Sequence, residues 1–137
     1  MRFMMIVKAS KDSEEGVMPG QELLSAMGKY NEELMKAGVL LDVAGLQASS
    51  KGARIQFSGG KRTVVDGPFT EAKELIAGYT LIQVKTREEA LEWTKRFPKP
   101  HFDHECEIEV RQLYELEDFE QTPAIEKFRE MDAARKH

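Results

Sequence analysis

Residues 105–112, ECEIEVRQ, alternate between polar and apolar side chains. Successive side chains of a strand point to opposite faces of a sheet, so this alternation predicts a strand with one buried face and one exposed face. The apolar members are Cys106, Ile108 and Val110. Cys106 is the single cysteine of the chain, and its place in the pattern predicts a buried thiol rather than a disulfide or a nucleophile.

Two long helices are predicted to cover one face of the sheet. The first spans about 20–37 and has apolar residues at spacings of three and four, with Gly38 as its stop signal. The second begins at a capping box formed by Thr86 and Glu89 and ends before Pro98. The apolar stripe of the first helix consists of Leu23, Met27, Tyr30 and Leu34.

The remaining segments predict further strands and a last helix. Three stretches look extended, namely 2–9, 39–47 and 78–85. Residues 53–58 and 61–66 flank Gly59-Gly60, which is a strong signal for a β-hairpin. Thr122 followed by Pro123 is typical of a helix start.

This order of elements matches the split βαβ arrangement of a ferredoxin-like α+β fold, with an inserted β-hairpin and a C-terminal helix. We expect residues 1–120 to form that domain and 121–137 a helical tail. Apolar side chains point both ways from strands 2–9 and 78–85, so the sheet face without helices needs a cover. A second copy of the chain is the simplest cover, and we expect a homodimer of the dimeric α+β barrel type.

Charge and composition exclude several classes of function. Lys and Arg number 20 against 24 Asp and Glu, and the basic residues are scattered, so no nucleic-acid surface is predicted. The apolar run near the N-terminus is too short for a signal peptide or a membrane span, so we expect a cytoplasmic protein without membrane contact. Phosphate-binding glycine motifs and the serine-hydrolase elbow are also missing from the sequence.

The stretch VVDGPFTEAKELIAGYTLIQV, residues 64–84, gives the chain its most specific pattern. Together with AGVLLDVAGLQ before it and EEALEWTKRFP and EIEVRQL after it, this stretch resembles the DGPF-motif branch of the YCII-related proteins. The resemblance covers about residues 2–120. It implies a ferredoxin-like subunit that dimerises through its sheet and has a pocket near the Asp-Gly-Pro-Phe loop.

A related branch of these proteins is linked to elimination chemistry on chlorinated hydroxyquinols, carried out by a histidine and an aspartate. Counting back from Gly38 places Met27 where that histidine stands, and Met27 also belongs to the apolar stripe of the helix. Asp42 is the nearest counterpart of the aspartate and lacks the imidazole partner. A proton-transfer reaction in this chain would therefore need another group.

The loop and its neighbours supply candidate site residues. We expect Asp66, Glu71 or Glu74 to act as acid or base, and Arg54 or Lys73 to hold an anionic group. The other candidate ligand-binding residues are Gly67, Pro68, Phe69, Gly78, Tyr79 and His101. The alternative is that Asp66 only shapes a turn and that the other charges are solvated.

No metal or cofactor is predicted. His101 and His104 are three residues apart, with acidic residues beside them, but this spacing fixes no third ligand. Two functions stay open. The chain is expected to bind a small polar or aromatic compound and to perform cofactor-free acid–base chemistry of a lyase or isomerase type. The alternative is a non-catalytic, ligand-sensing regulatory module, since some members of the resembled branch accompany extracytoplasmic sigma factors.

Overall fold

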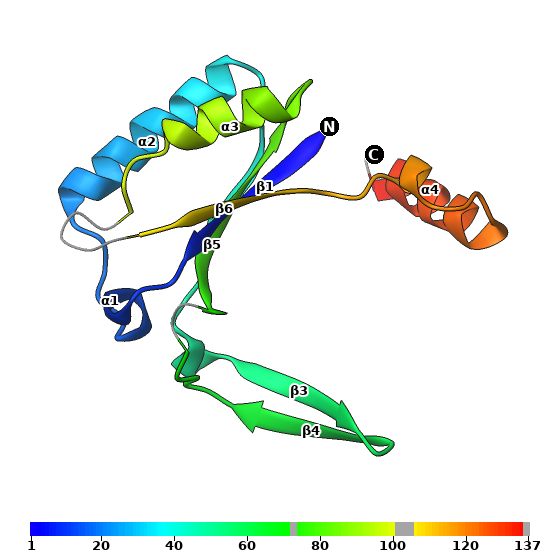
Figure 1. Ribbon diagram of the computed structural model, residues 1–137, viewed down its shortest axis with the longest axis horizontal. Helices are drawn as coiled ribbons and strands as arrows, with labels where there is room; N and C mark the ends of the chain where they lie inside the picture. The colour runs from blue at the N-terminus through cyan, green and yellow to red at the C-terminus, as the bar shows by residue number, and fades with distance from the viewer. Residues whose placement is uncertain (72–73, 101–105, 136–137) are drawn as a thin grey trace.

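The computed structural model describes residues 1–71, 74–100 and 106–135. A four-stranded antiparallel sheet has the order β2-β5-β1-β6, and helices α2 and α3 cover one of its faces (Figure 1). This order confirms the predicted ferredoxin-like α+β fold. The bounds are β1 Arg2–Lys8, α2 Gln21–Lys36, β2 Leu40–Gly45, β5 Ile76–Gln83, α3 Arg87–Lys95 and β6 Ile108–Gln112.

The core lies between the sheet and the two covering helices. Met5 and Ile82 point from the sheet toward Leu34 of α2, and all three side chains are fully buried. Tyr30 packs against Trp93 and donates a hydrogen bond of 2.6 Å to its backbone oxygen. Burial is the main reason that the pKa of the Tyr30 hydroxyl rises to about 12. The other buried apolar residues are Phe3, Val39, Val84 and Ala90.

The predicted helix ends are largely confirmed. Gly38 has a positive φ of 75°, which favours glycine, and its N–H donates to Met35 O. Thr86 Oγ1 accepts a hydrogen bond from the backbone of Glu89, as the capping box requires. The second hydrogen bond of the predicted capping box, from the N–H of Thr86 to the Glu89 carboxylate, is wrong. The Glu89 carboxylate accepts from the N–H of Lys85 instead.

The sequence analysis did not predict three short helical turns that lie wholly within the described residues. They are α1 Lys11–Glu14, η1 Ser49–Lys51 and η3 Leu116–Asp118. A single turn is too short to show apolar periodicity, so its signals are local hydrogen bonds. In α1, Ser10 and Ser13 cap the turn reciprocally.

The inserted hairpin and the last helix extend away from the sheet. β3 Ala53–Ser58 and β4 Lys61–Asp66 form their own two-stranded sheet, and Gly59 and Gly60 both have a positive φ, as the Gly-Gly turn predicts. Helix α4 runs from Pro123 to Arg135 behind the Thr122 cap, which confirms the predicted tail helix. Both extensions lie on the side of the sheet away from α2 and α3 (Figure 1).

We call the sheet face opposite α2 and α3 the open face. Helices α2 and α3 lie on the other side, and α4 approaches the open face only at its Arg2 end (Figure 1). In the described part of the chain, no helix combines the length and the apolar character that crossing a membrane requires.

Candidate functional site

The loop at residues 66–69, the DGPF loop, is fixed at the base of the hairpin. Gly67 donates its N–H to Gly52 O at 3.0 Å, and the following Gly67–Pro68 peptide bond is cis. A Cβ added at Gly67 would lie 1.9 Å from the backbone oxygen of Ser49, far inside van der Waals contact. Only glycine allows the loop to pack this closely on η1.

A chain of hydrogen bonds ties the DGPF loop to α1. The Glu14 carboxylate accepts from the backbone N–H of Ser49 at 3.0 Å and also from the Ser49 hydroxyl. The Ser49 hydroxyl oxygen in turn accepts from the N–H of Phe69 at 3.0 Å. The Arg54 guanidinium lies 3.7 Å from the centre of the Phe69 ring, in a cation–π contact. The loop is therefore a structural joint between the hairpin, η1 and α1.

The predicted acid–base residues stand outside this joint. Asp66 ends β4 opposite Ala53, and its side chain is exposed. Glu71 and Glu74 are also exposed, and no side-chain contact brings these three carboxylates together within the described residues. Lys73 and His101 lie outside the described residues.

Gly78 has a packing role. It is buried, and a Cβ at this position would lie 2.8 Å from Ala44 O and 3.3 Å from the Cα of Gly45. Glycine therefore lets β5 and β2 approach closely. The space beside Gly78 is filled by the backbone of β2.

The structure pairs Tyr79 with Asp42 on the open face. The Tyr79 hydroxyl donates a hydrogen bond of 3.1 Å to Asp42 Oδ2, and the N–H of Val43 donates to Oδ1 at 2.9 Å. The hydrogen bond to Asp42, followed by the negative charge of Asp42, raises the pKa of the Tyr79 hydroxyl above its ordinary value. The carboxylate is thus held on both oxygens and the phenol stays protonated.

Sequence reasoning missed this pair because the strand register was needed to find it. Ala44 lies opposite Tyr79, and Asp42 lies opposite Leu81, so the two side chains meet diagonally across β2 and β5. The pairing is irregular between Leu40 and Asp42, which changes the face on which Asp42 lies. No periodicity in the sequence reveals such an irregularity.

Beside the pair, the open face carries an apolar strip and then a charged cluster. Met4 and Ile6 of β1 and Leu81 of β5 form the strip and are partly exposed. On its far side, Glu109 Oε1 lies 3.1 Å from Lys8 Nζ, and Glu109 Oε2 lies 3.6 Å from Arg111 Nε. One carboxylate therefore lies between two cations at this end of the face.

Comparison with known proteins decides the family. The model of the YCII-related domain matches residues 1–114. This chain belongs to the YCII-related family. A relative, an uncharacterised protein of Rhizobium meliloti (strain 1021), is 37% identical over 86 residues. That match covers 63% of this chain and 64% of the relative, so it spans less than two thirds of the relative's length. Helix α4 lies beyond the YCII-related match.

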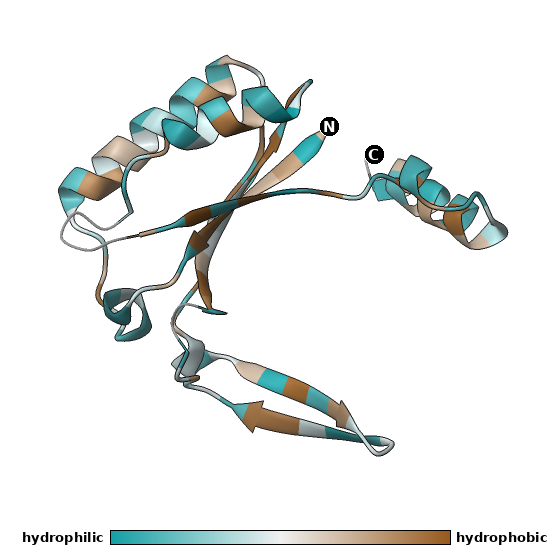
Figure 2. Ribbon diagram, viewed as in Figure 1, coloured by the Kyte–Doolittle hydropathy of each residue, from teal (hydrophilic) through white to brown (hydrophobic). Residues whose placement is uncertain are grey.

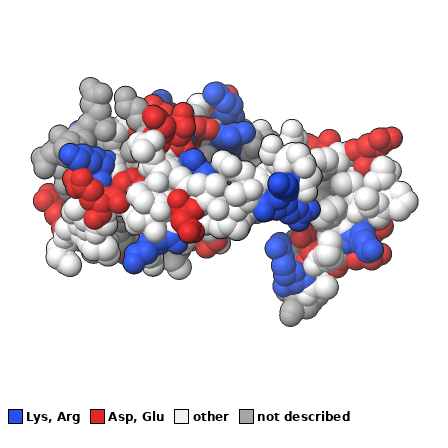
Figure 3. All heavy atoms as spheres, turned by 90° about the horizontal axis from the view of Figure 1, so that it is seen from below, with Lys and Arg blue, Asp and Glu red and all other residues white. Residues whose placement is uncertain are grey.

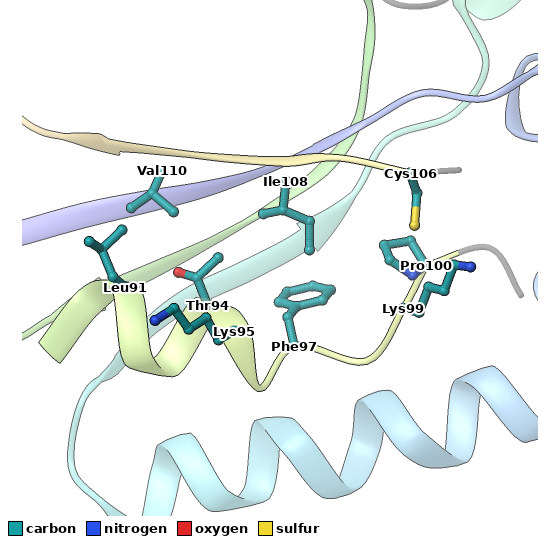
Figure 4. A pocket seen from close by; sticks show the side chains of 9 residues that line it. All are labelled: Leu91, Thr94, Lys95, Phe97, Lys99, Pro100, Cys106, Ile108 and Val110. Carbon is teal, nitrogen blue, oxygen red and sulfur yellow. The ribbon is translucent and has the colours of Figure 1, made fainter. Parts of the chain in front are cut away.

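The YCII-related domain has a cavity of about 390 Å³ at the opposite edge of the sheet, between α3 and β6 (Figure 4). Its walls are mainly apolar. Cys106, predicted to be buried within a strand, is only partly buried and lines this cavity, because β6 begins at Ile108 and Cys106 precedes this edge strand. The lining residues are Leu91, Thr94, Lys95, Phe97, Lys99, Pro100, Cys106, Ile108 and Val110.

A metal site finds no support in the part of this YCII-related chain that the structure describes, where no three His, Cys, Asp or Glu side chains are grouped to hold an ion. His101 and His104, the two histidines considered above, lie outside the described residues.

Proposed function

We propose that this YCII-related protein binds a small aromatic or polar compound on its open sheet face, and that it belongs to the DGPF-motif branch. The observation that carries the proposal is the hydrogen bond from Tyr79 to Asp42 on a face that no described helix covers. Asp66, Gly67, Pro68 and Phe69 support the placement in the branch.

The surface around the pair fits a ring with polar groups at both ends. Met4, Ile6 and Leu81 offer apolar contact to the ring. Each oxygen of the Asp42 carboxylate accepts one hydrogen bond and has room for a second, so it can take a hydroxyl proton from a ligand. The cluster of Lys8 and Arg111 around Glu109 favours an anionic substituent at the other end.

The chemistry we propose is proton transfer without a cofactor. Asp42 is the proton acceptor, and Tyr79 holds one of its oxygens in place and remains a hydrogen-bond donor. The acid–base role expected for Asp66, Glu71 and Glu74 stays a prediction. All four side chains are exposed, and Asp42 is the stronger candidate because two donors fix its carboxylate, whereas no hydrogen bond or ion pair within the described residues holds those of Asp66, Glu71 and Glu74.

A homodimer would complete the site. The apolar strip and the Tyr79–Asp42 pair lie on the same face, so a second copy packed there would bury both and exclude water from the ligand. This is the dimeric α+β barrel expected from the sequence, and we retain it as part of the proposal.

Amide NMR of the labelled chain tests the location of the site. Catechol, hydroquinone and 4-hydroxybenzoate serve as probes. We expect at least one of them to shift the backbone signals of Val43, Ala44 and Thr80 and to leave the hairpin tip unchanged. Shifts confined to the cavity between α3 and β6 would contradict the proposal. Binding without any chemical change in the probe would favour the ligand-sensing alternative.

A further inference from the structure

The hairpin presents an apolar surface that stays exposed among the residues that the structure describes. Ile55 and Val64 face each other across the two strands and are 49% and 62% exposed, and Phe57, two residues along the same face, is 69% exposed. The apolar segments of both strands are visible in Figure 2. Because an isolated two-stranded hairpin is at best marginally stable in water, this surface needs a partner.

The same hairpin is basic. Residues 51–66 contain four basic residues, Lys51, Arg54, Lys61 and Arg62, and one acidic residue, Asp66. Arg62 lies over the ring of Phe57 at 5.1 Å, so positive charge borders the apolar surface. Neither Lys61 nor Arg62 forms an ion pair with any other described residue.

The C-terminal segment, which we define as residues 115–135, has the complementary properties. Residues 115–120, ELEDFE, contain four acidic residues and no basic one. Glu115 pairs with Arg2, whereas Glu117 and Glu120 have no ion-pair partner within the described ranges. Phe128 and Met131 of α4 are 51% and 53% exposed and lie three residues apart on one side of the helix.

The two surfaces are apart within one chain. The hairpin and α4 extend separately on the side of the open face (Figure 1). Seen from below the view of Figure 1, basic and acidic side chains are interspersed over the surface, with uncharged surface between them (Figure 3). A second copy on the open face can bring its own hairpin to a C-terminal segment that one chain cannot reach with its own.

We propose that the hairpin of each copy packs on the C-terminal segment of the other copy. Ile55, Phe57 and Val64 meet Phe128 and Met131, and the basic hairpin tip lies beside the acidic residues that precede α4. A twofold axis repeats this contact, so both copies have their exposed surfaces covered. The inference rests on the proposed dimer.

A charge-swap experiment on the full chain tests it. One variant carries Lys61→Glu with Arg62→Glu, and the other carries Glu117→Lys with Glu120→Lys. Each variant alone places like charges at both contacts, so we expect its dimer dissociation constant to rise about tenfold or more in sedimentation at low salt. An equimolar mixture places opposite charges at both contacts, so we expect it to form dimers as tightly as the wild type.

The control and the other outcomes separate the two proposals. Lys36→Glu with Lys95→Glu changes the charge equally on helices that cover the other face, and should leave the dimer unchanged. Variants that dimerise like the wild type, or a mixture that does not recover, would overturn the hairpin contact and leave the dimer standing. A monomeric wild-type chain would overturn both the proposed dimer and the hairpin contact. The two exposed surfaces would then bind an unrelated partner.

Discussion

The hydroxyl of Tyr79 donates a hydrogen bond of 3.1 Å to the carboxylate of Asp42 across neighbouring strands of the sheet. Met27 occupies the position at which the related branch has the histidine partner of this aspartate, so Asp42 has no imidazole there. The fold gives the aspartate a phenol as partner instead. The Tyr79–Asp42 pair forms without any contact from the DGPF loop. The contacts of that loop link the hairpin, η1 and α1.

The first prediction concerns the alkaline titration of Tyr79. Its pKa is raised mainly by the hydrogen bond to Asp42, so it should titrate above the usual tyrosine value of about 10. Asp42→Asn should lower it toward that value, while Tyr30 should still titrate at about 12. Tyrosine absorbance or NMR during a pH titration measures this, with Tyr79→Phe identifying the signal. A Tyr79 titration that Asp42→Asn leaves unchanged would exclude the coupling.

The same shift has a consequence for stability. Tyr79 binds its proton more tightly in the folded chain than in the unfolded one, so its contribution to stability is complete below pH about 10. It should be lost as the pH rises through the folded-state value. Urea unfolding at several alkaline pH values should therefore show a steeper loss of stability in the wild type than in Tyr79→Phe. Equal slopes would argue against this linkage.

The second prediction compares two glycines. Gly67→Ala forces a Cβ against the backbone oxygen of Ser49 and should reduce the free energy of unfolding by about 1–3 kcal/mol. Gly28 in α2 has nothing within 4 Å of an added Cβ, so Gly28→Ala should raise it by about 0.5–1 kcal/mol. Urea denaturation of both variants measures the two effects. Equal stability of Gly67→Ala and the wild type would contradict the close packing of the DGPF loop.

The third prediction concerns the joint itself. Ser49→Ala removes the hydroxyl that links Phe69 to Glu14 and should reduce the free energy of unfolding by about 1–3 kcal/mol. Ser50→Ala changes the exposed neighbouring residue and should stay within about 0.5 kcal/mol of the wild type. Thermal or urea unfolding distinguishes them. Similar values for both serines would mean that the joint contributes little.

The fourth prediction separates the DGPF loop from the open face. Asp66→Asn, Glu71→Gln and Glu74→Gln alter exposed side chains, so each should shift the free energy of unfolding by no more than about 0.5 kcal/mol. Under the proposed function they should also bind the NMR probe as the wild type does. If one of these variants lost binding and kept its stability, its carboxylate would be part of the binding site.

The fold could be predicted because its signals are local. The stripe containing Tyr30 and Leu34 predicted the first helix, Gly59-Gly60 predicted the hairpin, and the alternation around Ile108 predicted a half-buried strand, which the structure has at 108–112 rather than 105–112. Each signal spans a few residues and reflects burial of one face or, for Gly59-Gly60, the positive φ of a tight turn. The inferred covering of one sheet face by both helices follows from their order along the chain.

The site could not be predicted in the same way because its contacts are long-range. Tyr79 and Asp42 are 37 positions apart and meet through an irregular strand register. The need for glycine at position 67 depends on the carbonyl of Ser49, in a separate turn. The preference of Asp, Gly and Pro for turns explains part of the DGPF loop. The group that holds Phe69 is the hydroxyl of Ser49, which is distant in the sequence.

Calorimetric titration of the probe found by NMR, into the wild type and into Asp42→Asn, tests the central claim most directly. The substitution keeps the size and shape of the side chain and removes its charge. The account predicts a dissociation constant raised about tenfold or more, because a charged hydrogen-bond acceptor is lost, while the thermal midpoint stays near that of the wild type. An unchanged dissociation constant in Asp42→Asn would contradict the placement of the site at Tyr79 and Asp42.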